Sequence, residues 1–470
     1  MQKASATKRT KEKNSKKPVN KMTRKQKRDL LEKFKFASEL LKIIKRFFPD
    51  LIPSLKLVVD PRNKSYIKYK TEIILFTRIL ALIFQINSMR SLTDNFNTQI
   101  AIDNIYKILD IDNLLELPHY DTINDFLSRL DPKELEKIIA ELANRLIRMR
   151  SFETSRIFDK YWQILLDGVN IYSFDEEHCK HCLRQTHNKG TQKEYTTYYH
   201  NVLEAKLVFC DEIVVCIASE FIENESPEVT KQDCETKAFY RLSEKIKAIF
   251  PRLPICLTMD SLYAQQNVFK ISIKNKWQYI ITFKDGSIKT VAEEFEALKN
   301  FEASIEDMRD DKRKYIGVNK IDYHDISLNM IEYSGIEGTE KDPKDIHFVF
   351  ITSYKITKKN YKAIVHHGRI RWDIENEGFN EQKKHGFNLE HVYSENYNAM
   401  KNHYYLIQIA HMIAQIFEKS SMIYKQTKLA TKQIFDKLRM KFLEHLITDK
   451  DIEATKVGFQ VRFEFERTIT

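Results

Sequence analysis

Short apolar runs alternate with helical patterns between residues 163 and 283, and this alternation limits the possible folds more than any other feature of the sequence. Three runs of strand formers come first, at 163–171, 198–210 and 213–221. Helical spacing and buried runs then alternate, in the order helix 231–250, strand 254–260, helix 261–273 and strand 277–283. Strands that alternate with helices in this way predict an α/β fold, with helices covering a mixed sheet.

Different patterns flank and interrupt this region. Residues 29–155 carry apolar side chains at helical spacing, which predicts an all-α module before the sheet. Residues 285–346 interrupt the α/β pattern with two alternating runs, 314–322 and 326–333, which predict a β-strand insertion. Residues 360–386 and 402–419 have helical spacing again, and the second of these is strongly apolar.

The positive charge of the chain lies in its first 28 residues. The chain has 77 Lys and Arg against 66 Asp and Glu, a formal net charge of +11. Residues 1–28 hold twelve Lys and Arg but only one acid, Glu12, so they carry this whole excess. Such a tail cannot bury apolar surface, and we expect it to be disordered when free. It provides salt-sensitive affinity for phosphates, or else it only keeps the protein in solution.

Composition excludes several other classes of protein. Six Cys in 470 residues do not make a disulfide scaffold, and ten Gly are too few for a fibrous chain. The longest apolar run, residues 73–84, contains Arg78 and is shorter than the about 20 residues of a membrane span. The basic N-terminus lacks the apolar region of a secretion signal, so we expect a cytoplasmic protein.

Three acids lie at positions where the active site of an α/β sheet is expected. Asp167 closes the first predicted strand, Asp260 closes the fourth, and Glu375 lies in the helical segment after the insertion. Active sites of open α/β sheets lie at the carboxyl ends of strands, so the two Asp converge if the first strand is central and adjoins the fourth. Converging carboxylates need a cation, and two Mg²⁺ ions can drive an in-line phosphoryl displacement. Alternatively, these are ordinary strand-end acids in a chain rich in acids.

Four motifs of this chain resemble those of bacterial insertion-sequence transposases with a DDE, ribonuclease-H-like core. They are LLDGVNIYSFDEEHCKHCL (165–183), KQDCETKA (231–238), MDSLYA (259–264) and RWDIENEGFNEQKKHG (371–386). The resemblance implies that Asp167, Asp260 and Glu375 ligand Mg²⁺ or Mn²⁺ and cut double-stranded DNA at transposon ends. Water would attack first, and the freed 3′ hydroxyl would then attack target DNA without a covalent enzyme intermediate. Because two ends must be held together, the resemblance also implies a homodimer on DNA in the nucleoid of a prokaryote.

The last motif departs from the family's pattern at two positions. That pattern has a Tyr three residues before Arg371, where Gly368 stands, and a Lys seven residues after the Glu, where Gln382 stands. The Arg spacing favours Glu375 as the third acid.

Two lysines follow this motif and leave a second acid open. Lys383 is eight residues after Glu375, whereas Lys384 is seven residues after Glu377, which makes Glu377 a rival. The two Glu side chains point about 200° apart on a regular helix, so only one can face the metals. We expect Arg371, Lys383 and Lys384 to contact DNA phosphates. For Arg371 and Lys384 the alternative is an i,i+4-type ion pair on the surface.

A cysteine and histidine cluster provides half of a second metal site. Cys179 and Cys182 are spaced as C-x2-C, which is one arm of a zinc site. His200 on the second strand and Cys234 before the first core helix are candidates for the other two ligands. The alternative is free thiols and surface histidines.

We therefore divide the chain into six segments and expect a DNA transposase. The segments are a basic tail (1–28), a helical DNA-binding module (29–155), a first part of the core (156–284), a β-rich insertion (285–346), a second part of the core with the catalytic helix (347–420), and a C-terminal helix and tail (421–470). Two alternatives remain open, a metal-dependent nuclease of the same fold without strand transfer and a catalytically inactive DNA-binding protein derived from a transposase.

Overall fold

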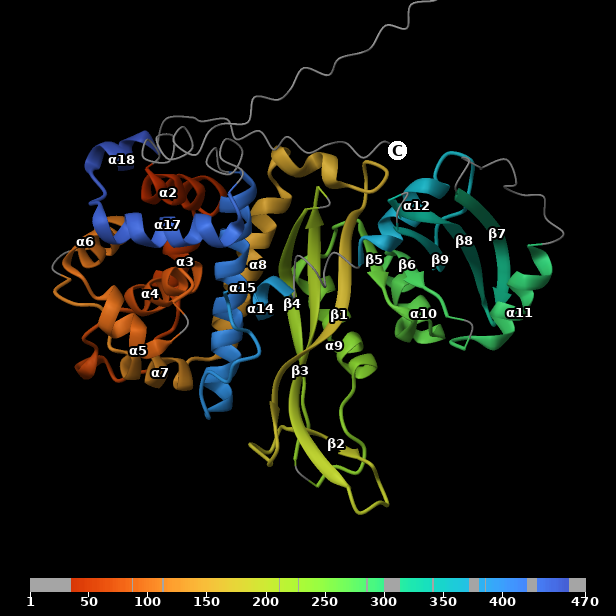
Figure 1. The fold of residues 1–470 in the computed structure, drawn as a ribbon, viewed down its shortest axis with the longest axis horizontal. Coiled ribbons are helices and arrows are strands. Elements are labelled where there is room, and N and C mark those ends of the chain that lie inside the picture. The colour runs from red at the N-terminus through yellow and green to blue at the C-terminus, as the bar shows by residue number, and fades with distance from the viewer. Residues whose placement is uncertain are drawn as a thin grey trace, which may run out of the picture.

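The protein has a helical part, at the left of Figure 1, and one sheet with its covering helices at the centre and right. Its structure is a computed structural model that describes residues 35–455 except 87, 112–113, 211, 227, 285, 300–312, 340–341, 372–379, 385 and 421–428. The expected α/β fold, in which a helical region precedes a mixed sheet, is confirmed.

Helices of the N-terminal third form most of the helical part. Every residue of α4 is buried, which makes it the central helix of this part. Asp131 caps α8 by accepting a hydrogen bond from the Lys133 amide, and Pro132 takes the first helical position, where no amide donor is needed. The helices are α2 (Phe36–Phe47), α3 (Leu51–Leu57), α4 (Thr71–Ile83), α6 (Gln99–Leu109), α7 (Tyr120–Arg129) and α8 (Pro132–Ile147), with the short turns η1 (Lys64–Tyr66), α5 (Met89–Ser91), η2 (Leu92–Phe96) and η3 (Arg150–Ser155).

Three helices from the C-terminal end pack into the same part. α15 (Tyr397–Ser420) contacts α4, α7 and α8, while α17 (Thr431–Glu444) contacts α2 and α6, and α18 (Asp449–Ala454) contacts α2. Asn104 of α6 donates to the carbonyls of Phe442 and His445 at 2.8 and 2.9 Å and accepts from the Ile447 amide at 2.7 Å. The two ends of the chain therefore share one hydrophobic core.

Nine strands form a single sheet in the order β2-β3-β1-β5-β6-β9-β8-β7, and β4 also pairs with β3. The central strand β1 is antiparallel to β3 and parallel to β5. Five of the strands, in the order β4-β3-β1-β5-β6, correspond to the five strands predicted between residues 163 and 283. The strands are β1 (Trp162–Phe174), β2 (Leu183–His187), β3 (Tyr195–Phe209), β4 (Ile213–Ile222), β5 (Ile255–Met259), β6 (Gln278–Thr282), β7 (Arg313–Tyr323), β8 (Ile326–Thr339) and β9 (Asp342–Thr352).

The two strands predicted for the insertion, β7 and β8, extend this same sheet. They join it through β9, which pairs antiparallel with both β6 and β8. The insertion also contains the helix α11 (Lys289–Leu298), which packs against β7.

The long strand β3 runs beyond the core and forms a projection with β2, seen at the bottom of Figure 1. We call residues 175–199 the finger. Strand β2 was not predicted, because only Leu183 of its five residues is buried and its sequence, LRQTH, has no apolar alternation.

Several of the described helices pack on the sheet, among them α8 and α15 of the helical part, which both pack on β4. α9 (Glu235–Ile249) packs on β3 and β4, and α10 (Gln266–Asn275) packs on β6. α12 (Tyr361–Arg369) covers β5, β6, β8 and β9, and it leads toward the short helix α14 (Glu381–Lys384).

Candidate active site and cysteine cluster

The strand pairing brings Asp167 and Asp260 together. β1 and β5 run parallel in a register that pairs Leu165 with Thr258. Two residues further on, the same register sets Asp167 opposite Asp260, which directly follows the last residue of β5. Residues paired in register on adjacent parallel strands project their side chains from the same face of the sheet, and the two strands lie about 4.8 Å apart. The predicted adjacency of the first and fourth strands is therefore confirmed. The prediction that Asp167 closes the first strand is wrong, because β1 continues to Phe174 through its pairing with β3.

Asp167 lies in an environment that disfavours its charge. Its carboxylate is mostly buried, and burial is the main cause that raises its pKa to about 6. The negative charges of Glu235 and Asp260 raise the pKa further, whereas the Arg371 guanidinium, 3.3 Å from Oδ2, lowers it. Arg371 does not fully offset the combined effect of burial and the neighbouring acids on this pKa, so a bound cation would stabilise the ionised form. This is the electrostatic condition that a divalent metal site requires.

Glu235 is a third acid of this group, and the sequence analysis did not single it out. It is the first residue of α9, and its carboxylate lies against the backbone of Gly168. A Cβ at Gly168 would stand 2.6 Å from Glu235 Oε2, so the close approach depends on glycine at this position. The only sequence signal is the Asp-Gly pair within β1, because nothing in the sequence ties α9 to that strand.

A tyrosine holds Glu235 in place. Tyr263, in the turn η4 (Ser261–Tyr263) directly after Asp260, donates a hydrogen bond to Glu235 Oε1 at 2.6 Å. Burial, together with the charge of Asp260, still raises the pKa of Glu235. Asp260 itself accepts a hydrogen bond from the Leu262 amide at 2.9 Å, which fixes one of its oxygens. The three carboxylates thus influence one another's charge, although among the described residues they do not form a group with all ligand atoms within 4.8 Å of one another.

The catalytic-helix motif is only partly described. Arg371 reaches Asp167, as expected for a residue of the site. Glu375 and its rival Glu377 lie outside the described residues, as does the side chain of Lys384. Lys383 forms an ion pair with Glu390 at 2.9 Å. Lys383, expected to contact DNA, is therefore engaged by an acid of its own chain in the DNA-free protein.

The buried surroundings of Gln382 account for one departure from the family's pattern, which has a Lys at this position. Its side chain is fully buried and donates to Gln408 at 2.9 Å, and it also bonds His411 at 3.0 Å. Lys206 of β3 approaches Gln382 Oε1 at 3.4 Å and pairs with Glu204 at 2.8 Å. Gln382 is too deeply buried to contact DNA. The buried Lys206 of β3 lies beside this position, at which the family's pattern has a lysine of its own.

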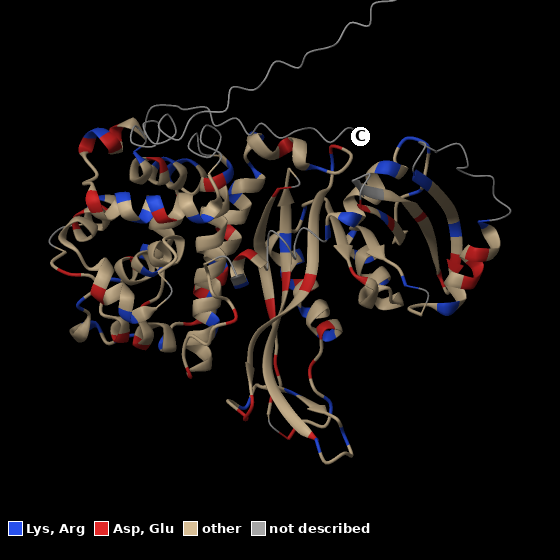
Figure 2. Ribbon diagram, viewed as in Figure 1, with Lys and Arg blue, Asp and Glu red and all other residues tan. Residues whose placement is uncertain are grey.

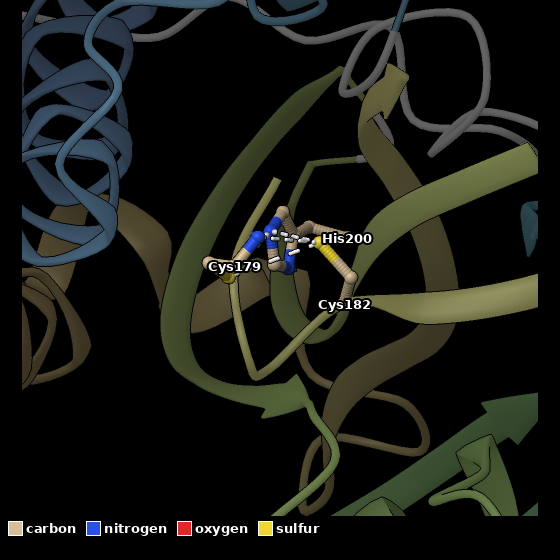
Figure 3. Close-up of side chains that lie close together, drawn as sticks. All are labelled: Cys179, Cys182 and His200. Carbon is tan, nitrogen blue, oxygen red and sulfur yellow. Dashed lines mark hydrogen bonds between the residues drawn. The ribbon is translucent and has the colours of Figure 1, made fainter. Parts of the chain in front are cut away.

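A second group of potential ligands lies at the base of the finger. Cys179, Cys182 and His200 place their sulfur and nitrogen atoms within 4.8 Å of one another, as Figure 3 shows. Cys234, the other candidate ligand, is exposed, precedes α9 and is not in this group. The structure thus brings together three of the four residues suggested for this site.

The surface charges are mixed over most of the protein (Figure 2). The basic tail and much of the catalytic-helix motif are outside the described residues. Lys and Arg also mark the tip of the finger in Figure 2, where Lys189 and Lys193 are exposed. Within the described ranges, no helix is both long enough and apolar enough to cross a membrane.

Comparisons with known proteins agree with this architecture. Residues 52–143 match the family described as DDE_Tnp_1-associated, and residues 227–413 match the family described as Transposase DDE domain. Together these matches span more than half of the chain and include Asp260 and Arg371. No curated protein sequence matches the chain.

Among solved structures, the chain is similar to piggyBac transposase in its synaptic complex with hairpin DNA. The identity is 12%, the match covers 89% of this chain and 82% of that chain, and the TM-score is 0.42. A likeness at this level carries no inference about the site.

Proposed function

Because this chain belongs to the DDE transposases, which cut and rejoin DNA, we propose that Asp167, Asp260 and Glu375 are its catalytic carboxylates. The parallel register of β1 and β5 is the observation that carries this proposal, since it sets the first two acids side by side. Arg371, four residues before Glu375 in the sequence, forms an ion pair with Asp167, which supports a place for this motif beside the first aspartate.

DDE transposases depend on divalent metal ions, and we propose Mg²⁺, or Mn²⁺ in its place, for this one. The residues fit such ions, because Asp167 and Asp260 offer hard oxygen ligands and the charge around Asp167 favours a cation. Glu235 is a further candidate ligand or orienting group beside Asp167. When bound, the metals would activate the attacking oxygen and stabilise the leaving oxygen of the phosphodiester.

The protein's own groups have separate roles in this proposal. Asp260 is oriented by the Leu262 amide, and Glu235 is oriented by Tyr263. Arg371 holds Asp167 in the free protein and can turn to a DNA phosphate when metals compensate the carboxylates. For Lys383 to contact a phosphate, it must first leave Glu390.

DNA binding and pairing of ends complete the proposal. Residues 1–28 and the helical module 29–155 would bind DNA, with phosphate contacts from Arg371, Lys383 and Lys384. Two transposon ends must be cut and joined together, so we propose a homodimer on DNA, acting on the chromosome of a prokaryotic cell.

Cleavage of a duplex that carries the element's end tests the site. Asp167→Asn, Asp260→Asn and Glu375→Gln should abolish cleavage, whereas Glu377→Gln and the exposed control Asp345→Asn should retain it. An Asp260→Cys variant should be inactive with Mg²⁺ and partly active with Mn²⁺, since a thiolate accepts the softer metal better. Full cleavage by Asp260→Asn would refute the assignment, and an inactive Glu377→Gln with an active Glu375→Gln would move the third acid by two residues.

Supplying ends that are already cut tests the second step. A transposase joins such ends to a target plasmid, whereas a nuclease of the same fold leaves them free. Joining should be lost in the same three variants, because one set of carboxylates serves both displacements.

A further inference from the structure

We infer that Cys179, Cys182 and His200 bind a structural zinc ion, separate from the catalytic metals, and that His178 supplies its fourth ligand. His200 pairs with Tyr172, five residues along β1 from Asp167, so this site is separate from the proposed catalytic carboxylates. The site would lie at the base of the finger, where the loop after β1 meets β3.

The spacing of the three ligand atoms matches a zinc tetrahedron. The two sulfur atoms are 3.8 Å apart, and His200 Nε2 is 3.5 Å from each of them (Figure 3). Zinc bonds of about 2.3 Å to sulfur and about 2.0 Å to nitrogen give tetrahedral edges of roughly 3.8 Å between sulfurs and roughly 3.5 Å from sulfur to nitrogen. The three side chains are thus already arranged as three corners of a zinc site.

The surrounding groups support thiolate ligands. The backbone amide of Cys179 donates to Cys182 Sγ at 3.3 Å, which stabilises negative charge on that sulfur. The His200 side chain is buried and its ring stacks on Tyr397, with ring centroids 4.6 Å apart. This contact holds Nε2 toward the sulfurs, so the histidine needs no rearrangement to bind a metal.

His178 is the best candidate for the fourth corner. It precedes Cys179 directly, and its Nε2 is buried with no hydrogen-bond partner among the described residues. Its ring stacks on Phe174, whose own ring meets the His200 ring edge-on. A side-chain rotation would therefore bring an unused nitrogen toward the cluster.

The two other nearby candidates fit less well. The His181 ring stacks on Tyr397, as the His200 ring does, and its Nδ1 bonds the Asn224 carbonyl at 3.0 Å. Cys234 is exposed and lies outside the cluster.

The zinc would connect the finger to the start of α15 and to the segment between β4 and α9. Tyr397, at the start of α15, stacks on His200 and donates to Glu223 Oε2 at 2.5 Å. Asn224 donates to the Cys182 carbonyl at 2.8 Å, and Gln232 bonds both backbone groups of Arg184 in β2. The segment between β4 and α9 thus runs from the cluster to Glu235. Loss of the metal should loosen the finger and also the start of α9.

Metal analysis of the purified full-length protein tests the inference directly. Wild type, dialysed without chelator, should retain about one zinc ion per chain. Cys182→Ser and His200→Ala should lose it, while the matched control Cys234→Ser should keep it. Wild type without zinc, together with two freely reactive thiols at Cys179 and Cys182 or a disulfide between them, would overturn the site.

Cobalt substitution tests the geometry and the fourth ligand. Co²⁺ in place of zinc should give the intense visible bands of a tetrahedral site and a sulfur-to-cobalt charge-transfer band. His178→Ala should change the visible bands, whereas His181→Ala should leave them unchanged. An unchanged spectrum for His178→Ala would remove that residue from the site, and octahedral bands without charge transfer in wild type would refute the whole proposal.

Two measurements remain informative if the cysteine variants fail to fold. Chelation of wild-type zinc should lower the thermal midpoint, and added Zn²⁺ should restore it where Mg²⁺ does not. Zinc content does not depend on DNA cleavage, so failure of this inference and failure of the catalytic assignment are distinguishable.

Discussion

Removing the buried cation Lys206 should destabilise the protein far more than removing a surface cation. Lys206 and Glu204 are both fully buried and lie 2.8 Å apart on β3. Glu204 also accepts hydrogen bonds from Tyr404 and Gln408 of α15. In Lys206→Met the side chain keeps its length, but Glu204 becomes a buried charge with no cation. Breaking a buried pair in this way costs about 3–5 kcal/mol.

Urea denaturation followed by circular dichroism measures this cost. The control is Arg129→Met, which removes an exposed ion pair with Asp125 on α7 and should cost about 0.3–0.5 kcal/mol. The double variant Glu204→Gln, Lys206→Met removes both charges and should recover most of the lost stability. Equal costs for Lys206→Met and the control, or a double variant no better than the single one, would refute the reasoning.

Three further predictions follow from the described contacts. Gly168→Ala should lower DNA cleavage roughly 10–100-fold by displacing Glu235, while Gly286→Ala, with open space around it, should be neutral in the same assay. The pKa of Asp167 is raised to about 6 in the folded protein. Its contribution to the free energy of unfolding of the metal-free protein is therefore fully present below about pH 3.8 and is lost as the pH rises through about 6. Mn²⁺ affinity measured by calorimetry should instead fall as the pH drops below about 6, because protons compete with the metal for Asp167. Asp167→Asn should weaken Mn²⁺ binding and flatten this pH dependence. An unchanged pH profile in that variant would assign the titration to another group. Asn104→Ala should cost about 1–3 kcal/mol in thermal unfolding because three buried bonds to the C-terminal helices are lost, and a cost equal to that of the exposed control Asn95→Ala would contradict this.

Local sequence pattern was sufficient for the main elements of the core. The runs that became β1, β3, β4, β5 and β6 are apolar enough to be buried on both faces, so their order and the positions of Asp167 and Asp260 followed from the sequence. The predicted convergence depended on one further assumption, that the first strand is central, and the sheet order confirms it.

The edge strand β2 and the way the insertion joins the sheet could not be predicted from local sequence pattern. β2 has a polar sequence and is a strand only because β3 offers its backbone groups. Whether β7 and β8 form a separate unit or extend the sheet depends on the pairing of β9 with β6. Such backbone pairing leaves little trace in side-chain periodicity.

The sequence by itself determined which residues can carry the chemistry, and the tertiary structure decided which of them meet. The local pattern identified the two strands that carry Asp167 and Asp260, although Asp167 lies within β1 and not at its end. Glu235 reaches β1 only through the packing of α9, and His200 meets Cys179 and Cys182 only because β3 folds back on the loop after β1. Contacts between distant segments depend on the packing of the whole chain, and one sequence records that packing only where it also shapes a local pattern.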